Sequence, residues 1–184
     1  MTSKDTVVLT TYLQSTKAPW TSLLVVTDGK RAESLVRPPT GFALKVIRGR
    51  HCKTPANLFA EFARALEFPD YFGHNWDALE ECLADLEWLP AKGYILLVTN
   101  AEGVLPEDEE EYETFLEILR DAGEAWGNGQ AGMGARRATP FHVLFAVSEQ
   151  DKAKRAYWGM KEINAEPARE ANARQRSLKR RPSR

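Results

Sequence analysis

The side chains best placed to do chemistry are carboxylates gathered in one short segment, residues 75–87. Asn75 is a residue type that caps helix N-termini, and Asp77 follows in the first turn, where the helix dipole favours negative charge. At about 100° per residue, one side of the predicted helix carries acidic side chains and the other carries apolar ones. The acidic side consists of Asp77, Glu80, Glu81 and Asp85, and the apolar side of Leu79, Cys82, Leu83 and Leu86.

This acidic side has two interpretations. Carboxylates four residues apart repel each other and cost an isolated helix about 0.2–0.5 kcal/mol per pair. The predicted helix contains no Lys or Arg to neutralise them, so it is either an ordinary solvated face or a surface built to receive a cationic partner. Tyr71 and Phe72 lie just before it and could supply an aromatic anchor, unless one or both pack in the core.

Length and composition suit one domain with tails, or two very small domains. The 184 residues are 43% hydrophobic and include five Trp, enough for a real core. The sequence lacks an apolar run long enough to span a membrane, so no membrane partner is expected. Its first residues, MTSKDTVVLTTYLQ, do not resemble a secretory signal. Cys52 and Cys82 form neither a disulfide framework nor a zinc pattern, and a cytoplasmic location is expected.

The net charge of −1 conceals a strong asymmetry. After residue 147 there are eleven basic and five acidic residues, whereas residues 54–134 contain three basic and eighteen acidic ones. The body of the protein is therefore expected to attract cations. Residues 148–184 form a basic tail with little apolar content, which we predict to be flexible. This tail could bind nucleic-acid phosphates or contact the acidic face of the same protein.

Apolar periodicity predicts a small α/β domain. Three strands are predicted at residues 42–48, 94–99 and 141–147, and three helices at residues 55–67, 75–87 and about 107–125. The order β-α-α-β-α-β, with continuous apolar strands, indicates a small parallel sheet of about three strands with helices packed on it. Residues 1–41 are expected to be an N-terminal extension, with residues 23–27 adding a strand at the sheet edge.

An enzyme is not expected. Asp77 and Glu81 lie opposite the apolar side of their helix, where solvent screens them, and a general acid needs burial or a close like charge. His51, His74 and His142 share no metal-ligand spacing, and the common phosphate-binding, dinucleotide-binding and nucleophile motifs are absent. Neither a cofactor nor a metal ion is expected. A two-carboxylate hydrolase would require a pocket, which the sequence does not show.

Residues 69–79, PDYFGHNWDAL, followed by ECL at 81–83, resemble the signature of the barstar family, the intracellular inhibitors of barnase-type ribonucleases. A weaker resemblance extends over roughly residues 44–147, and FLEILRDA at 115–122 resembles the later helix of that family. The resemblance implies a barstar-like domain over residues 42–147. It also implies that a carboxylate-rich helix blocks the active site of a nuclease.

The resemblance assigns roles to individual residues. Tyr71 would stack against the partner, Asp77 would meet active-site Arg or Lys groups, Glu81 would occupy a phosphate position, and Asp121 would supply a third carboxylate. The expected partner-binding residues are Tyr71, Gly73, Asn75, Trp76, Asp77, Glu80, Glu81, Asp85 and Asp121. Glu81 stands where the family has Asp, and Glu80 stands where it has an aromatic residue; both departures bear on which nuclease is bound.

The expected function is therefore that of an intracellular immunity protein. It would bind a basic secreted ribonuclease or nuclease toxin, one to one and without a cofactor. The alternative is a scaffold or regulatory module whose acidic face and basic tail bind a different partner, or each other.

Overall fold

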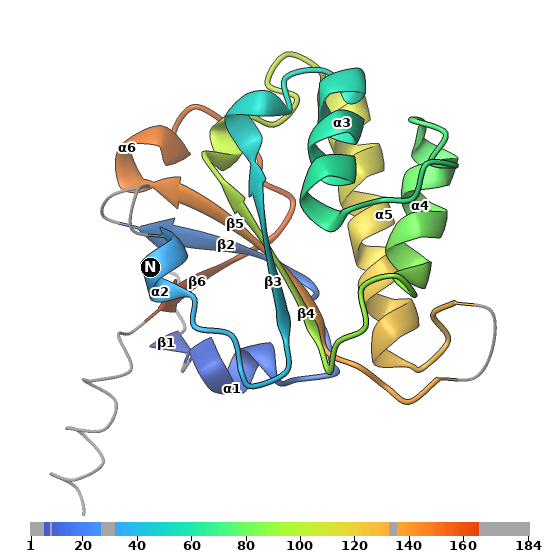
Figure 1. The fold of residues 1–184 in the computed structure, drawn as a ribbon. Helices are drawn as coiled ribbons and strands as arrows, with labels where there is room; N and C mark the ends of the chain where they lie inside the picture. Colours follow the sequence, from blue (N-terminus) through green and yellow to red (C-terminus); the bar gives the residue numbers. More distant parts are fainter. Residues whose placement is uncertain (1–5, 8, 27–31, 133–135, 166–184) are drawn as a thin grey trace, which may run out of the picture.

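The computed structural model describes residues 6–7, 9–26, 32–132 and 136–165, which form one parallel β-sheet with helices on both faces (Figure 1). The strand order is β1-β6-β2-β5-β4-β3, and all five neighbouring pairs are parallel. This confirms the predicted parallel α/β class, although the described chain has six strands where about three were expected. The strands are β1 (Thr6–Val7), β2 (Thr21–Val26), β3 (Ala43–Arg48), β4 (Tyr94–Thr99), β5 (Phe141–Ser148) and β6 (Lys161–Ala165).

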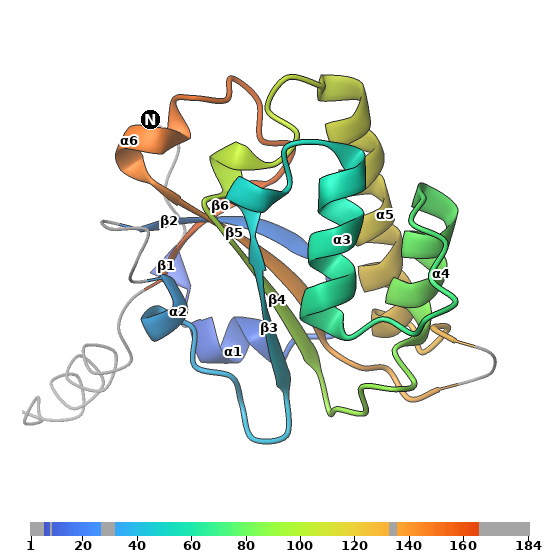
Figure 2. The ribbon, with the colours of Figure 1, turned by 45° about the horizontal axis from the view of Figure 1, so that its top comes forward.

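Helices cover the two faces of the sheet unequally (Figures 1 and 2). Three long helices pack on one face: α3 (Pro55–Leu66), α4 (Trp76–Asp85) and α5 (Glu109–Gly127). Two short helices pack on the other: α1 (Leu9–Leu13) and α2 (Ala32–Leu35). Leu96 of β4 joins the core under the long helices, and its neighbour Leu97 joins the core under the short ones. Burial on both faces explains why β4 and β5 are continuous apolar runs.

The ends of the long helices follow from local side chains. Thr54 caps α3 by accepting a hydrogen bond from the Asn57 amide at 3.3 Å, and Pro55 occupies the first helical position. Asp108 caps α5 in the same way, accepting from the Glu111 amide at 3.1 Å. The predicted helices at 55–67, 75–87 and 107–125 thus differ from the observed ones by one or two residues at their ends.

The strand predicted at residues 23–27 corresponds to β2, which lies inside the sheet rather than at its edge; the N-terminal edge position is taken by β1. β2 pairs with β5 on one side and with β6 on the other. Five of its six residues are buried, because both of its faces and both of its edges are covered. Residues 23–27 were expected to form it; the strand begins two residues earlier, and residue 27 lies outside the described residues.

The start of the predicted flexible tail is also ordered into the fold, contrary to expectation. After β5 the chain forms α6 (Glu149–Lys152) and β6, which places a strand between β1 and β2. The Arg155 guanidinium lies 3.6 Å from the centre of the Tyr112 ring and donates to the Leu105 carbonyl at 3.2 Å. Arg120 Nη2 donates to the Gly159 carbonyl at 3.0 Å. Residues 166–184, the rest of the expected tail, lie outside the described residues.

Two short 3₁₀ turns complete the described chain, η2 (Gly49–His51) after β3 and η3 (Ala101–Gly103) after β4. Within the described segments, no helix combines the length and the apolar character needed to cross a lipid bilayer.

His142 joins the N-terminal segment to the sheet. It is fully buried on β5, and its Nε2 lies 2.8 Å from the Ser15 carbonyl, so the neutral ring carries its proton on Nε2. The Tyr12 ring lies 4.6 Å from the imidazole centre to centre. Burial lowers the pKa of His142, because the charged ring would lose its hydration.

We predict that His142 makes the folded state sensitive to mild acid. Below about pH 6.5 the unfolded chain gains a proton on this ring that the folded chain does not, so the free energy of unfolding falls by up to about 1.4 kcal/mol per pH unit. In His142→Gln this term disappears. Urea unfolding between about pH 7 and 5.5 should therefore show a shallower decline for the variant than for the wild type. Parallel declines would contradict the prediction, whatever the absolute stability of the variant.

Candidate protein-binding face

The loop before α4 sets the direction of the acidic helix. Asn75 accepts a hydrogen bond from the Ala78 amide at 2.8 Å and so caps α4, as predicted. The residue of this loop with a left-handed backbone conformation is His74, with φ of 50°. A Cβ on Gly73 would lie 3.3 Å from Asn75 Nδ2, so the glycine leaves room for the capping side chain.

The acidic side of α4 faces solvent, and the apolar side faces the core. Asp77, Glu80 and Glu81 are exposed, whereas Leu79, Cys82 and Leu83 are buried. None of these three carboxylates makes a salt bridge or a side-chain hydrogen bond with another described residue. Their charge is therefore available to a partner.

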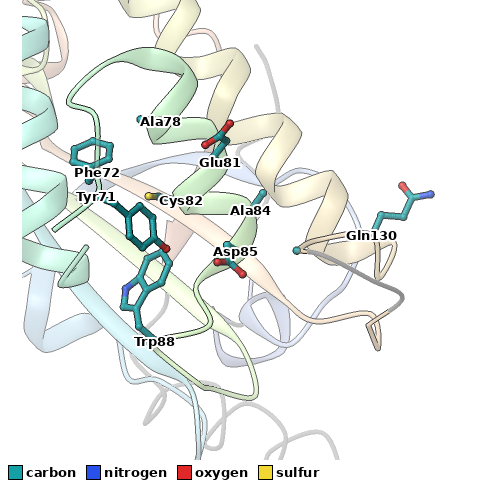
Figure 3. Close-up of a pocket in the computed structure, with 10 residues that line it drawn as sticks. Tyr71, Phe72, Ala78, Glu81, Cys82, Ala84, Asp85, Trp88 and Gln130 are labelled. Carbon is teal, nitrogen blue, oxygen red and sulfur yellow. The ribbon is translucent and has the colours of Figure 1, made fainter. Parts of the chain in front are cut away.

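A groove of about 510 Å³ lies beside these carboxylates (Figure 3). Tyr71, which is 73% exposed, and Trp88 line it together with Glu81 and Asp85 of α4. The indole N–H of Trp88 donates to the Leu66 carbonyl at 2.9 Å, which fixes that wall of the groove. Trp88 was not among the expected binding residues; its only sequence signal is a large aromatic side chain just beyond the end of an acidic helix.

Trp76 holds α4 in place from within the protein. Its indole N–H donates to Glu111 Oε2 on α5 at 2.6 Å, and its ring meets Phe59 of α3 edge-on at 4.8 Å between centres. A second indole, that of Trp126 on α5, donates to the Leu83 carbonyl at 2.8 Å. Trp76 was expected to contact the partner; the structure gives it intramolecular partners on both neighbouring helices.

Asp85 is the one expected carboxylate of α4 that has a cation beside it. Arg136 Nη2 lies 3.3 Å from Asp85 Oδ1 and 2.8 Å from Glu87 Oε1, and Nη1 donates to the Asp85 carbonyl at 3.0 Å. The same guanidinium lies over the Trp126 ring, 5.3 Å from its centre. Arg136 therefore closes the C-terminal end of α4, where the helix dipole favours a cation.

Asp121 lies on α5, which packs against α4 (Figure 1). Its side chain is exposed and has no ion pair among the described residues. Apart from Gly73, which has no side chain, the expected residues thus fall into two groups. Tyr71, Asp77, Glu80, Glu81 and Asp121 present free side chains at the surface, and Asn75, Trp76 and Asp85 are engaged within the protein.

The described residues do not gather three His, Cys, Asp or Glu side chains that could hold a metal ion. Both cysteines are buried, and burial raises the pKa of Cys82 to about 11 and of Cys52 to about 12. Neither thiol is therefore a thiolate nucleophile near neutral pH.

The described chain is a parallel α/β fold in which α4 carries exposed carboxylates without a partner among the described residues. A family model described as "Barstar (barnase inhibitor)" matches residues 42–146, more than half of the chain. The protein therefore belongs to the barstar family, as the resemblance of residues 69–83 predicted. The match runs from β3 into β5 and leaves β1, β2 and β6 outside it. No curated protein in the comparison matches the chain.

Family membership supports a role like that of a barnase inhibitor at the level of the family. Members of this family are inhibitors rather than enzymes, and the family implies a ribonuclease as the partner.

We predict that Arg136 stabilises the end of α4. In Arg136→Met the aliphatic stem can still cover Trp126, but the charged hydrogen bonds to Asp85 and Glu87 are lost. The free energy of unfolding should fall by about 1–2 kcal/mol. The neighbouring exposed Arg137, which has no side-chain bond to a described residue, provides the control Arg137→Met. Equal urea midpoints for the two variants would refute the role given to Arg136.

Proposed function

We propose that this protein inhibits a basic ribonuclease or nuclease toxin by inserting the acidic side of α4 into the partner's active site. The observation that carries the proposal is that Asp77 and Glu81 of α4 are exposed and unpaired within the described residues, and that Glu81 lines the same groove as the exposed ring of Tyr71. A ribonuclease binds RNA phosphates with Arg and Lys, and carboxylates on a rigid helix present the same charge to those groups.

The rigidity of α4 supports this proposal. Carboxylates four residues apart repel each other, by about 0.7 kcal/mol in bulk water and more where solvent is excluded. The cap at Asn75 and the two indole hydrogen bonds fix the helix in spite of this repulsion. Because the side chains are positioned before binding, the partner need not order them.

Each contacting residue has a distinct role in the proposal. Tyr71 stacks on a flat group at the rim of the active site, and its neighbouring groove accepts a side chain of the partner. Asp77 and Glu81 pair with active-site cations, and Asp121 on α5 extends the negative surface. Asp85 and Trp76 act indirectly, because Arg136 and Glu111 already occupy their polar atoms.

Glu80 gives the face a feature of its own. It is exposed on α4 one residue before Glu81, so the helix carries three unpaired carboxylates within five residues. A partner with an additional Arg or Lys at the matching position gains an ion pair, whereas a partner with an apolar surface there must desolvate a charge. We therefore expect a more basic active-site rim in the nuclease that this protein recognises.

The first test removes charge without changing shape. Asp77→Asn combined with Glu81→Gln should weaken inhibition of RNA hydrolysis by barnase, or by a related basic ribonuclease, at least about 100-fold, because losing one member of a desolvated ion pair costs about 3–5 kcal/mol. The thermal midpoint should not fall, since neither side chain has a partner in the described protein.

The matched control is Glu33→Gln combined with Glu107→Gln, two exposed carboxylates outside α4. It changes the net charge by the same amount and should leave inhibition within about threefold of wild type. Wild-type inhibition by the α4 double variant would show that the assigned face is wrong. A wild-type protein that inhibits none of these nucleases would favour the scaffold alternative.

The second test uses salt. Opposite fields should accelerate association, so raising NaCl from about 50 to 500 mM should slow association at least about tenfold and change the dissociation rate much less. Stopped-flow binding to a ribonuclease measures both rates. An association rate that does not depend on salt would contradict the proposal that the carboxylates of α4 attract the cations of the nuclease active site.

A further inference from the structure

A basic pocket lies on a different part of this acidic protein, where β3 ends and α3 begins. Its volume is about 590 Å³. None of its lining residues comes from α4 or α5. The polar side chains that line it are Arg48, Arg50, His51, Lys53, Asn57 and Arg64, with Glu61 among them.

Glu61 organises two of these cations. Its side chain is 3% exposed and accepts from Arg48 Nε at 2.8 Å and Nη2 at 2.7 Å, and from Arg64 Nε at 3.0 Å and Nη2 at 2.7 Å. The Arg48 amide adds a further bond at 2.9 Å. Burial alone would raise the pKa of Glu61, but the hydrogen bonds from both arginines outweigh it and hold the pKa well below its usual range.

The bonds to Glu61 use one edge of the Arg48 guanidinium and leave its other edge open. Arg64 Nη2 donates to the Val46 carbonyl at 3.3 Å as well as to Glu61, so on Arg64 only Nη1 stays open. Nη1 of Arg48 and Nη1 of Arg64 make no hydrogen bond to another described residue. The ionised Glu61 neutralises one of the two arginines, so the trio retains a positive charge and its geometry is fixed before any ligand binds.

The remaining basic side chains of the pocket have no acidic partner among the described residues. Arg50, His51 and Lys53 are exposed and make no salt bridge within the described chain. Lys45, which lies on the same strand as Arg48, is by contrast paired with Glu67 at 2.6 Å. The pocket is therefore a local excess of positive charge, although residues 54–134 contain eighteen acidic and three basic residues.

We infer that this pocket binds a small phosphate-bearing anion. Guanidinium edges and an ammonium match the oxygens of phosphate, and Asn57 adds a neutral donor at the same wall. Among the described residues no aromatic ring lines the pocket apart from the imidazole of His51, so these residues do not offer the stacking platform that single-stranded nucleic acid uses. A compact ligand such as a diphosphate fits these groups better than an RNA strand.

Pyrophosphate is the probe for the test. The full chain should bind it saturably in low-salt buffer, measured by calorimetry, with the amide signals of Arg50 and Asn57 shifting in NMR spectra. Arg50→Ala combined with Lys53→Ala should weaken binding at least about tenfold, or about 1.4 kcal/mol. Both side chains are exposed and have no described partner, so the fold and its thermal midpoint should persist.

The control is Lys17→Ala combined with Arg37→Ala, which removes one exposed Lys and one exposed Arg outside the pocket. It should change the dissociation constant by less than about twofold. Equal weakening by both double variants, or no saturation at about 10 mM pyrophosphate, would overturn the site.

A second arm replaces pyrophosphate with a short uridine oligonucleotide. Tighter binding of the oligonucleotide that is lost in the Arg50 and Lys53 variant would assign the pocket to nucleic acid and overturn the small-anion assignment. Glu81→Gln, on the proposed inhibitory face, should leave pyrophosphate binding unchanged. A defect there would overturn the separation of the two sites.

Discussion

The structure depends on two indole hydrogen bonds that hold α4 against α5. Trp76 donates from α4 to the Glu111 carboxylate, and Trp126 donates from α5 to the Leu83 carbonyl, so each helix anchors the other. The bond from Trp126 is buried, and the bond from Trp76 is partly buried. Without such anchors, a ten-residue helix with several adjacent negative charges and no cation of its own would be marginal.

The acidic face of α4 and the basic pocket at the start of α3 are separate surfaces of opposite charge. Glu61 and Asp85, two carboxylates that connect separate segments, are each bonded to an arginine from another part of the chain. Asp77 and Glu81, by contrast, are left unpaired within the described chain. No ion pair in the described chain joins the carboxylates of α4 to the basic side chains of the pocket. The proposed nuclease-binding face and the proposed anion pocket can therefore coexist in one small domain.

Local features were readable from the sequence, and long-range ones were not. The Asn75 cap, the exposed carboxylates and the buried β4 follow from residue types and periodicity over a few positions. The hydrogen bond from Trp76 joins residues 35 positions apart and the contact between Asp85 and Arg136 joins residues 51 positions apart, so neither could be predicted from local spacing. Strand β6, with the sequence KEINA, has too few apolar residues for its sequence to predict a strand. Because β6 was not predicted, the strand that became β2 was predicted to lie at a sheet edge.

The position of β2 makes the two ends of the chain depend on each other. The segment that matches the family begins at β3 and stops within β5, so β5 would have an open hydrogen-bonding edge if that segment stood alone. β2 from the N-terminal region satisfies that edge, and β6 from the C-terminal region satisfies β2 in turn. Removing either end would strip backbone partners from a strand that belongs to the other. The described additions at the two ends thus form one structural unit. A domain cut from residues 42–146 would expose the backbone edge of β5 that β2 pairs with in the longer chain.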